Sequence, residues 1–153
     1  MPRSSRDSDA SMDLVARASV VIRAPRRAVW SALLAPATIP EILPVSEVVQ
    51  GWRLGEPFVW VFSLGDIESR VEGRVVAVVE ERLLEYEYVD PHARVVQGTH
   101  NVHRVTIELS DDDLATRVSV VQDANLSLEA QAHAEGGWRL ALNNLRTLVE
   151  KNW

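Results

Sequence analysis

The feature that most constrains this fold is an amphipathic stretch at residues 136–150. At 3.6 residues per turn, its apolar side chains fall on one stripe, while the opposite side is polar. The stripe consists of Trp138, Ala141, Leu142, Leu145, Leu148 and Val149. This pattern predicts a long helix that must bury one side against another layer of the protein.

Two adjacent glycines open this stretch and are unusual there, because a glycine inside a helix costs about 1 kcal/mol relative to alanine. Glycine also allows another group to approach the backbone closely. We therefore expect Gly136 and Gly137 to mark the place where the helix passes closest to a strand or to a cavity mouth. Trp138 would then form a wall or plug of that cavity.

The segments before this helix alternate between apolar and polar residues, which is typical of half-buried strands. The first strand is expected at residues 14–23, followed by a short helix at 26–35 and a second short helix or turn at 37–43. Further strands are expected at residues 45–50, 58–62, 67–75, 84–88, 101–109 and 116–122. Short connections between them, such as Gly65-Asp66, predict antiparallel pairing. The fold class is therefore α+β, with about seven antiparallel strands and a long C-terminal helix.

The composition is that of one globular domain. The chain has 153 residues, of which 46% are hydrophobic and 25% charged, as in soluble proteins of this size. Residues 1–13 are polar and are expected to form a disordered tail, and residues 14–153 to form a single domain. No apolar run approaches the roughly 20 residues that cross a bilayer, and the tail lacks the apolar stretch of a secretory signal. We expect a cytoplasmic protein without a membrane partner.

Several function classes are disfavoured by the residues present. The chain has no cysteine, which excludes disulfides, thiolate catalysis and cysteine-bound zinc. Its net charge of -6 argues against a nucleic-acid partner, because proteins that bind nucleic acids normally have a basic face. His100 and His103 lie three apart in an expected strand and so face opposite sides. Since no metal-binding, phosphate-binding or dinucleotide-binding motif is present, we expect no metal and no cofactor.

The order of elements is similar to the helix-grip fold of the Bet v 1-like, START-related superfamily, also called SRPBCC. Residues 20–30 resemble the opening strand and helix of that superfamily. The closing helix resembles the branch named for the activator of Hsp90 ATPase, through Gly137, Trp138, Ala141, Leu142 and Leu145. The resemblance covers roughly residues 14–150. It implies a curved sheet wrapped around the C-terminal helix, with hydrophobic small molecules bound between the two.

A ligand cleft between sheet and helix is expected from this geometry, because ligand sites are concave and mostly apolar, with a few polar groups. The candidate ligand-binding residues are the inward-facing ones on both layers. They are Trp60, Phe62, Val71, Tyr86, His103, Val105, Val118, Trp138 and Leu142. The alternative is that these side chains simply fill a core, as most inward aromatic residues do.

His103 is the most interesting titratable residue, since the alternation points it inward with Val105. An inward histidine can orient a ligand or act as a general acid or base, with Tyr86, Tyr88 or Asn101 as neighbours. The alternative is a hydrogen-bonded or solvated histidine near a strand end. No carboxylate or nucleophile is recognisable as its partner, so we favour that alternative and predict no catalytic residue.

Three functions follow from the residues and the resemblance. The first, which we favour because catalytic groups are scarce, is non-catalytic binding of a hydrophobic small molecule. The second is an aromatase/cyclase-like enzyme acting on a polyketide-type substrate, with His103 or a cavity tyrosine moving a proton. The third is a co-chaperone that activates an Hsp90-type ATPase. It ranks last because relatives with that activity carry a further N-terminal domain that this sequence does not show. The sequence is also compatible with a homodimer.

Overall fold

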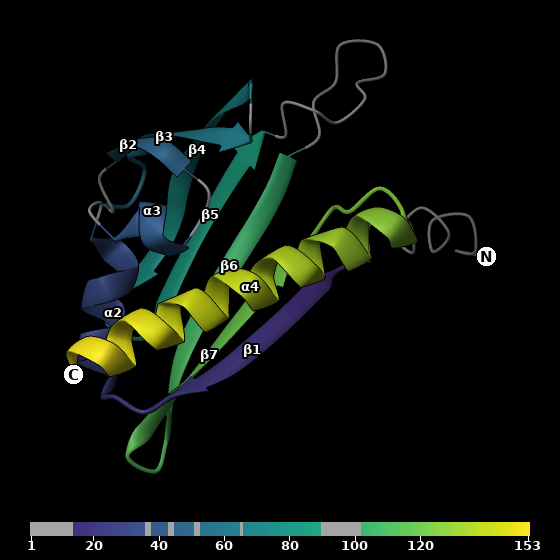
Figure 1. The fold of residues 1–153 in the computed structure, drawn as a ribbon. Coiled ribbons are helices and arrows are strands. Elements are labelled where there is room, and N and C mark those ends of the chain that lie inside the picture. Colours follow the sequence, from purple (N-terminus) through teal and green to yellow (C-terminus); the bar gives the residue numbers. More distant parts are fainter. Residues whose placement is uncertain (1–13, 36–37, 43–44, 51–52, 65, 90–101) are drawn as a thin grey trace.

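One antiparallel sheet and one long helix dominate the computed structural model, which describes residues 14–35, 38–42, 45–50, 53–64, 66–89 and 102–153. The long helix lies across one face of the curved sheet (Figure 1). The expected α+β class is confirmed. In chain order the elements are β1 Ala16–Ile22, α2 Arg26–Leu34, α3 Ile39–Ile42, β2 Val45–Gln50, β3 Pro57–Leu64, β4 Ile67–Val79, β5 Leu83–Val89, β6 Val102–Asp112, β7 Ala115–Gln122 and α4 Leu128–Asn152.

The sheet order brings the first and last strands together. It runs β1-β7-β6-β5-β4-β3-β2, so that β2 to β7 pair with their sequence neighbours and β1 joins β7. Register shifts interrupt the β2–β3 pairing near Val45 and the β4–β5 pairing near Val75. Such bulges bend a strand and increase its twist, which helps the sheet to curve. Of the segments expected from the sequence, the tail at residues 1–13 and residues 37, 43, 65 and 101 lie outside the described residues.

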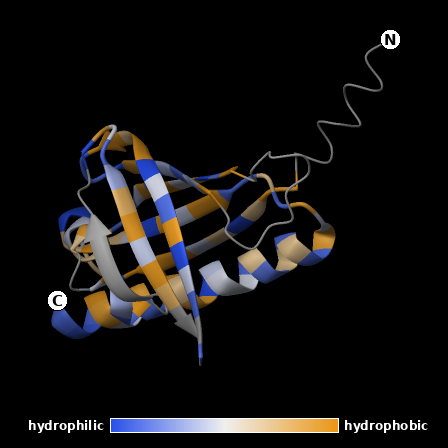
Figure 2. Ribbon diagram, turned by 90° about the horizontal axis from the view of Figure 1, so that it is seen from above, coloured by the Kyte–Doolittle hydropathy of each residue, from blue (hydrophilic) through white to orange (hydrophobic). Residues whose placement is uncertain are grey.

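The alternation of residues along the strands separates an inner from an outer face, and Figure 2 shows it as alternating orange and blue bands. On β6 and β7 the inner residues face each other in register, as in the pairs Ile107–Val120 and Leu109–Val118. These four side chains are buried. The outer face carries exposed pairs such as Arg104 and Glu87, whose Nη2 and Oε2 atoms are 3.1 Å apart. Exposed pairs of this kind contribute about 0–1 kcal/mol to the free energy of unfolding. The sheet is therefore stabilised mainly by burial of its inner face.

Helix α4 begins at Leu128, eight residues earlier than the sequence pattern predicts. Ser127 caps it, because its hydroxyl oxygen accepts a hydrogen bond from the backbone N–H of Ala130 at 3.0 Å. Such a cap satisfies an N–H group that the helix leaves without a partner. The predicted stripe is otherwise confirmed. Its buried members are Ala141, Leu142, Leu145 and Val149, and its half-buried members Trp138 and Leu148 pack against the same core.

The expected close contact between the glycine pair and a strand is wrong. A Cβ atom added to Gly136 or to Gly137 would meet nothing within 4 Å. Because the helix starts upstream, both glycines lie in its interior. They cost helix stability there, and packing of the described residues does not require them.

Helix α4 packs mainly beside β1, and its other principal neighbours are α2, α3 and β7. Small inner residues on β1, Ala16 and Ala18, leave room for the helix. Polar side chains of α4 also bind the edge of β1 that faces away from β7. Glu135 accepts from Arg17 N at 3.0 Å, Glu150 accepts from Arg23 N at 2.8 Å, and Gln131 donates to Val15 O at 2.9 Å. The helix therefore covers an edge whose backbone groups lack strand partners.

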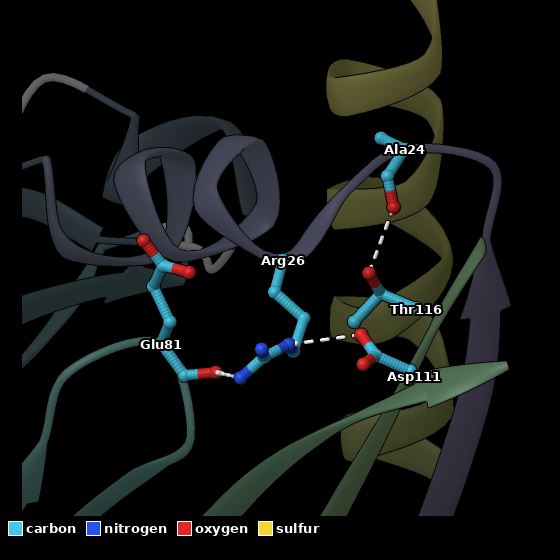
Figure 3. A network of polar contacts seen from close by, with 5 residues as sticks. All are labelled: Ala24, Arg26, Glu81, Asp111 and Thr116. Atoms are coloured by element: carbon cyan, nitrogen blue, oxygen red, sulfur yellow. Dashed lines mark hydrogen bonds and ion pairs between the residues drawn. The ribbon is translucent and has the colours of Figure 1, made fainter. Parts of the chain in front are cut away.

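A polar network fixes the start of α2 to two turns of the sheet (Figure 3). The guanidinium of Arg26 lies between the Asp111 carboxylate, 2.9 Å from Nε, and the Glu81 carbonyl, 3.3 Å from Nη1. Nearby, the Thr116 hydroxyl donates to the Ala24 carbonyl at 2.7 Å. This network lies at the far end of β6 from His103. The Asp111 carboxylate therefore contributes to a structural contact.

Candidate functional site

The inner face of β3 to β6 carries six rings in one connected series, formed by Phe58, Trp60, Phe62, Tyr86, Tyr88 and His103. We call it the aromatic series. Neighbouring centroids are 6.2 Å apart for Phe62–Trp60, 5.1 Å for Trp60–Phe58, 5.3 Å for Phe58–Tyr86, 6.4 Å for Tyr86–Tyr88 and 5.1 Å for Tyr88–His103. These separations are typical of favourable aromatic pairs.

Gly73 on β4 lets rings from two different strands meet. It is the register partner of Phe58 on β3 and of Tyr88 on β5. A Cβ atom added to Gly73 would lie 2.5 Å from Cζ of Phe58 and would also press against the Glu87 carbonyl. The absent side chain therefore leaves space for the Phe58 ring above β4, from which it reaches Tyr86.

Burial varies along the aromatic series. Phe58, Trp60 and Tyr86 are buried, whereas Phe62 and Tyr88 are half-buried. Trp138 of α4 is also half-buried and packs against the same core. The middle of the series is thus closed by its own packing, and its accessible aromatic surface lies at Phe62 and Tyr88.

His103 points inward as predicted and is only 4% exposed. Its Nδ1 atom lies 2.8 Å from the backbone carbonyl of Asp123. A carbonyl oxygen only accepts, so Nδ1 carries the proton in this bond. The carboxylate of Asp123 instead accepts from Arg104 N at 2.7 Å. Of the neighbours expected from the sequence, Tyr88 is in ring contact with His103, and Asn101 lies outside the described residues.

Tyr86 is the other titratable group of the site. Burial raises the pKa of its hydroxyl well above the ordinary value of 10.0, and the nearby Tyr88 raises it further. Burial acts this way because it disfavours the charged phenolate. Tyr86 therefore stays protonated at neutral pH and does not act as a phenolate base there.

A buried amide network closes the α4 side of the site. The indole N–H of Trp138 donates to Oε1 of Gln122 at 2.8 Å, and Nε2 of Gln122 lies 3.4 Å from Oδ1 of Asn125. Nδ2 of Asn125 donates to the carbonyls of Leu14 at 2.7 Å and Gln122 at 3.0 Å. Gln122 and Asn125 were not among the site residues predicted from the sequence. The available signal was an amide at an inward position after Val120.

The structure brings all nine predicted site residues to the inner side of the fold. Five of them belong to the shared core, namely Trp60, Tyr86, Val105, Val118 and Leu142. Phe62 and Trp138 pack against that core, and Val71 and His103 are buried on the same face. Their role as ligand contacts stays a prediction. In the described part of the chain, no group of three or more acidic or histidine side chains is placed to hold a metal. No described helix is long and apolar enough to cross a membrane.

Comparison with known proteins places these features in a family. The solution structure of ChR145 from Cytophaga hutchinsonii is similar, with a TM-score of 0.77 and 29% identity over 92% of this chain and 97% of that one. MLL2253 from Mesorhizobium loti has a TM-score of 0.75 and 21% identity, over 90% and 97% of the two chains. DynU16, described as a protein in the dynemicin biosynthetic locus, has a TM-score of 0.75 and 19% identity, over 92% of this chain and 48% of that one.

No curated protein matches the chain. Residues 23–150 match the family model described as Activator of Hsp90 ATPase homolog 1-like protein, which confirms the resemblance inferred from the sequence. The chain therefore belongs to the family of Activator of Hsp90 ATPase homolog 1-like proteins.

Proposed function

We propose that this protein binds an apolar, ring-containing small molecule on the inner face of its sheet, beside the aromatic series, and does not transform it. The aromatic series is the observation that carries this proposal. Flat rings stack on one another and meet edge to face, so a continuous ring surface favours aromatic ligands. The half-buried rings of Phe62 and Tyr88 offer the accessible part of that surface.

The position of α4 supports the same proposal. The principal neighbours of α4 in the described part of the chain are β1, α2, α3 and β7, and not the aromatic strands β3 to β5. The rings of those strands are therefore packed chiefly by other side chains. Side chains can rearrange to admit a ligand more readily than the backbone of a helix.

The polar groups of the site favour binding over turnover. The buried polar side chains among the described residues are His103, Thr116, Gln122 and Asn125, and none is a carboxylate. General acid–base catalysis needs groups that exchange protons near the working pH. The raised pKa of Tyr86 makes this residue a poor general base at neutral pH.

Fluorescence of the neutral probe N-phenyl-1-naphthylamine tests the proposal. We expect saturable fluorescence enhancement, and a bound ligand at 100 times its Kd should add about 2.7 kcal/mol to the free energy of unfolding. Phe62→Ala and Trp138→Ala should weaken binding several-fold. Leu140→Ala is a matched control, because Leu140 lies on α4 but is 63% exposed. Absence of both saturable fluorescence and thermal stabilisation would contradict the proposal.

An aromatase/cyclase-like reaction is a second candidate. It is favoured by the buried position of His103 against Tyr88, and a structural neighbour, DynU16, is described as part of a biosynthetic locus. Turnover of a polyketide-type substrate that is lost in His103→Ala, with binding of N-phenyl-1-naphthylamine preserved, would favour this candidate. Absence of turnover with the wild-type protein as well as with His103→Ala would leave simple binding as the function.

A further inference from the structure

We infer that Gln122 selects ligands that carry a neutral hydrogen-bond acceptor, such as a ketone or quinone carbonyl, on an aromatic framework. This inference rests on the proposed function, since it concerns the ligand of the same face. Gln122 is only 7% exposed, and it continues the inner face of β7 after Val118 and Val120. An amide at this position is costly to bury unless its polar atoms find partners.

Trp138 fixes the orientation of the Gln122 amide. An indole N–H can donate a hydrogen bond but cannot accept one. The amide atom that lies 2.8 Å from Nε1 of Trp138 is therefore the oxygen, Oε1. It follows that the NH₂ group of Gln122 points away from Trp138.

That NH₂ group is poorly satisfied by the protein. It offers two hydrogens, and its partner among the described residues is Oδ1 of Asn125 at 3.4 Å, which is long for an N–H···O bond. The Asn125 amide cannot turn to improve this contact, because both hydrogens of Nδ2 are given to the carbonyls of Leu14 and Gln122. Buried amide donors are nearly always paired. The second N–H of Gln122 is therefore available to donate a hydrogen bond to an acceptor that the described residues do not supply.

The donor lies close to the aromatic series. Gln122 is the register partner of Val105 on β6, and His103 is the next inner residue on that strand. Diagonal neighbours on one face of a sheet lie about 7–8 Å apart, which is the span of a two-ring ligand. A ligand stacked at Tyr88 and His103 can thus direct a carbonyl oxygen toward Nε2 of Gln122.

The charge of the surroundings narrows the ligand class further. None of the described inner-face side chains is a lysine or an arginine. Arg104 lies on the outer face, in an ion pair with Glu87. A carboxylate ligand would be buried here without a counter-charge, which is strongly unfavourable. The acceptor is therefore a neutral group, such as a ketone or quinone carbonyl.

The test uses a pair of ligands that differ in one group. 2-Acetylnaphthalene carries a ketone, and 2-isopropenylnaphthalene has a similar shape with a CH₂ group in place of the oxygen. Both are titrated as competitors of N-phenyl-1-naphthylamine. The wild-type protein should bind the ketone about fivefold more tightly than the alkene, which is the contribution of one neutral hydrogen bond. Gln122→Met lacks the donor and introduces no charge, and should bring this ratio to about one.

Two further variants make the result decisive. Gln122→Leu also lacks the donor and introduces no charge, so it serves if Gln122→Met does not fold. Gln131→Met is the matched control, because Gln131 binds Val15 O at the sheet edge, and it should keep the fivefold ratio. Gln122 variants that weaken both ligands equally would assign Gln122 a purely structural role and overturn the inference. An equal affinity of the wild-type protein for both competitors would overturn the inference while the proposed function stands. Failure of N-phenyl-1-naphthylamine to bind would contradict both.

Discussion

The inner face of the sheet has two unlike halves. Under α4, β1 and β7 present aliphatic side chains such as Val20 and Val118, which share a buried core with helix residues such as Leu145. On β3 to β5, the same face presents the large rings of the aromatic series. The aliphatic half lets the helix come close, whereas the aromatic half is packed by its own rings. One sheet thus combines a part suited to stability with a part suited to recognition.

The halves also differ in burial, because only part of the aromatic series is buried. Leu145 is 1% exposed, while the aromatic series is accessible at Phe62 and Tyr88. Free energy gained on folding scales with the apolar area removed from water. Substitutions in the aliphatic half should therefore reduce stability most, and substitutions at the accessible rings should reduce ligand binding most.

The largest effect is expected for Leu145→Ala in the aliphatic half, which should lower the free energy of unfolding by about 3 kcal/mol through lost burial and a residual cavity. Urea denaturation at neutral pH measures this. Leu148→Ala is the control on the same stripe, because Leu148 is half-buried and should cost less. Equal losses would mean that the stripe does not define the packed side of α4.

In the aromatic half, Gly73→Ala should lower the free energy of unfolding by about 1–3 kcal/mol, as overpacking commonly does. The new methyl group would collide with Phe58 and with the Glu87 carbonyl. Near-ultraviolet circular dichroism should change as well, since the Phe58 ring must leave its position. Unchanged stability and an unchanged spectrum would show that these rings are loosely held.

A pH titration probes the aromatic half without changing its shape. The folded-state pKa of Tyr86 is raised above 10.0, so only the unfolded chain loses this proton just above pH 10. The free energy of unfolding should then fall by about 1.4 kcal/mol per pH unit from this residue, from pH 10 up to the raised pKa. Tyr86→Phe should remove this component of the slope. An identical pH dependence in both proteins would contradict the assignment.

The smallest effect, and one of opposite sign, is expected in α4. Gly136→Ala and Gly137→Ala should each raise the free energy of unfolding by up to about 1 kcal/mol, because the new Cβ meets nothing within 4 Å. Thermal or urea denaturation measures the gain. Gly55→Ala is the matched control and should lose stability, since Gly55 has a φ of +82°, which disfavours a side chain. A loss at the helical glycines would show that the helix needs them.

The elements of the fold were predictable because strands and helices differ in the period of their apolar residues. The start of α4 was missed because residues 128–137 contain no buried side chain, so the stripe that marks a helix is absent there. The cap at Ser127 was the usable signal. Apolar periodicity finds the packed part of a helix, and capping residues find its end.

For the site, the sequence likewise predicts which face each residue lies on. Alternation places His103 and Tyr86 on the inner face, but it does not supply their partners. The Gln122–Trp138 hydrogen bond joins a strand to a helix, so it depends on the rotation of α4 over the sheet. The acceptor of His103 depends on the register of β6 and β7, which sets the position of Asp123.

The pairing of β1 with β7 has a consequence for synthesis on the ribosome. β1 is made before the other strands, yet its partner strand is the last to be made, and the helix that covers its other edge follows still later. Throughout translation of the intervening residues, both edges of β1 lack their native partners. Nascent chains with unpaired strand edges are prone to association with one another. The completed C-terminal helix thus covers the outer edge of β1 once that strand has joined the sheet.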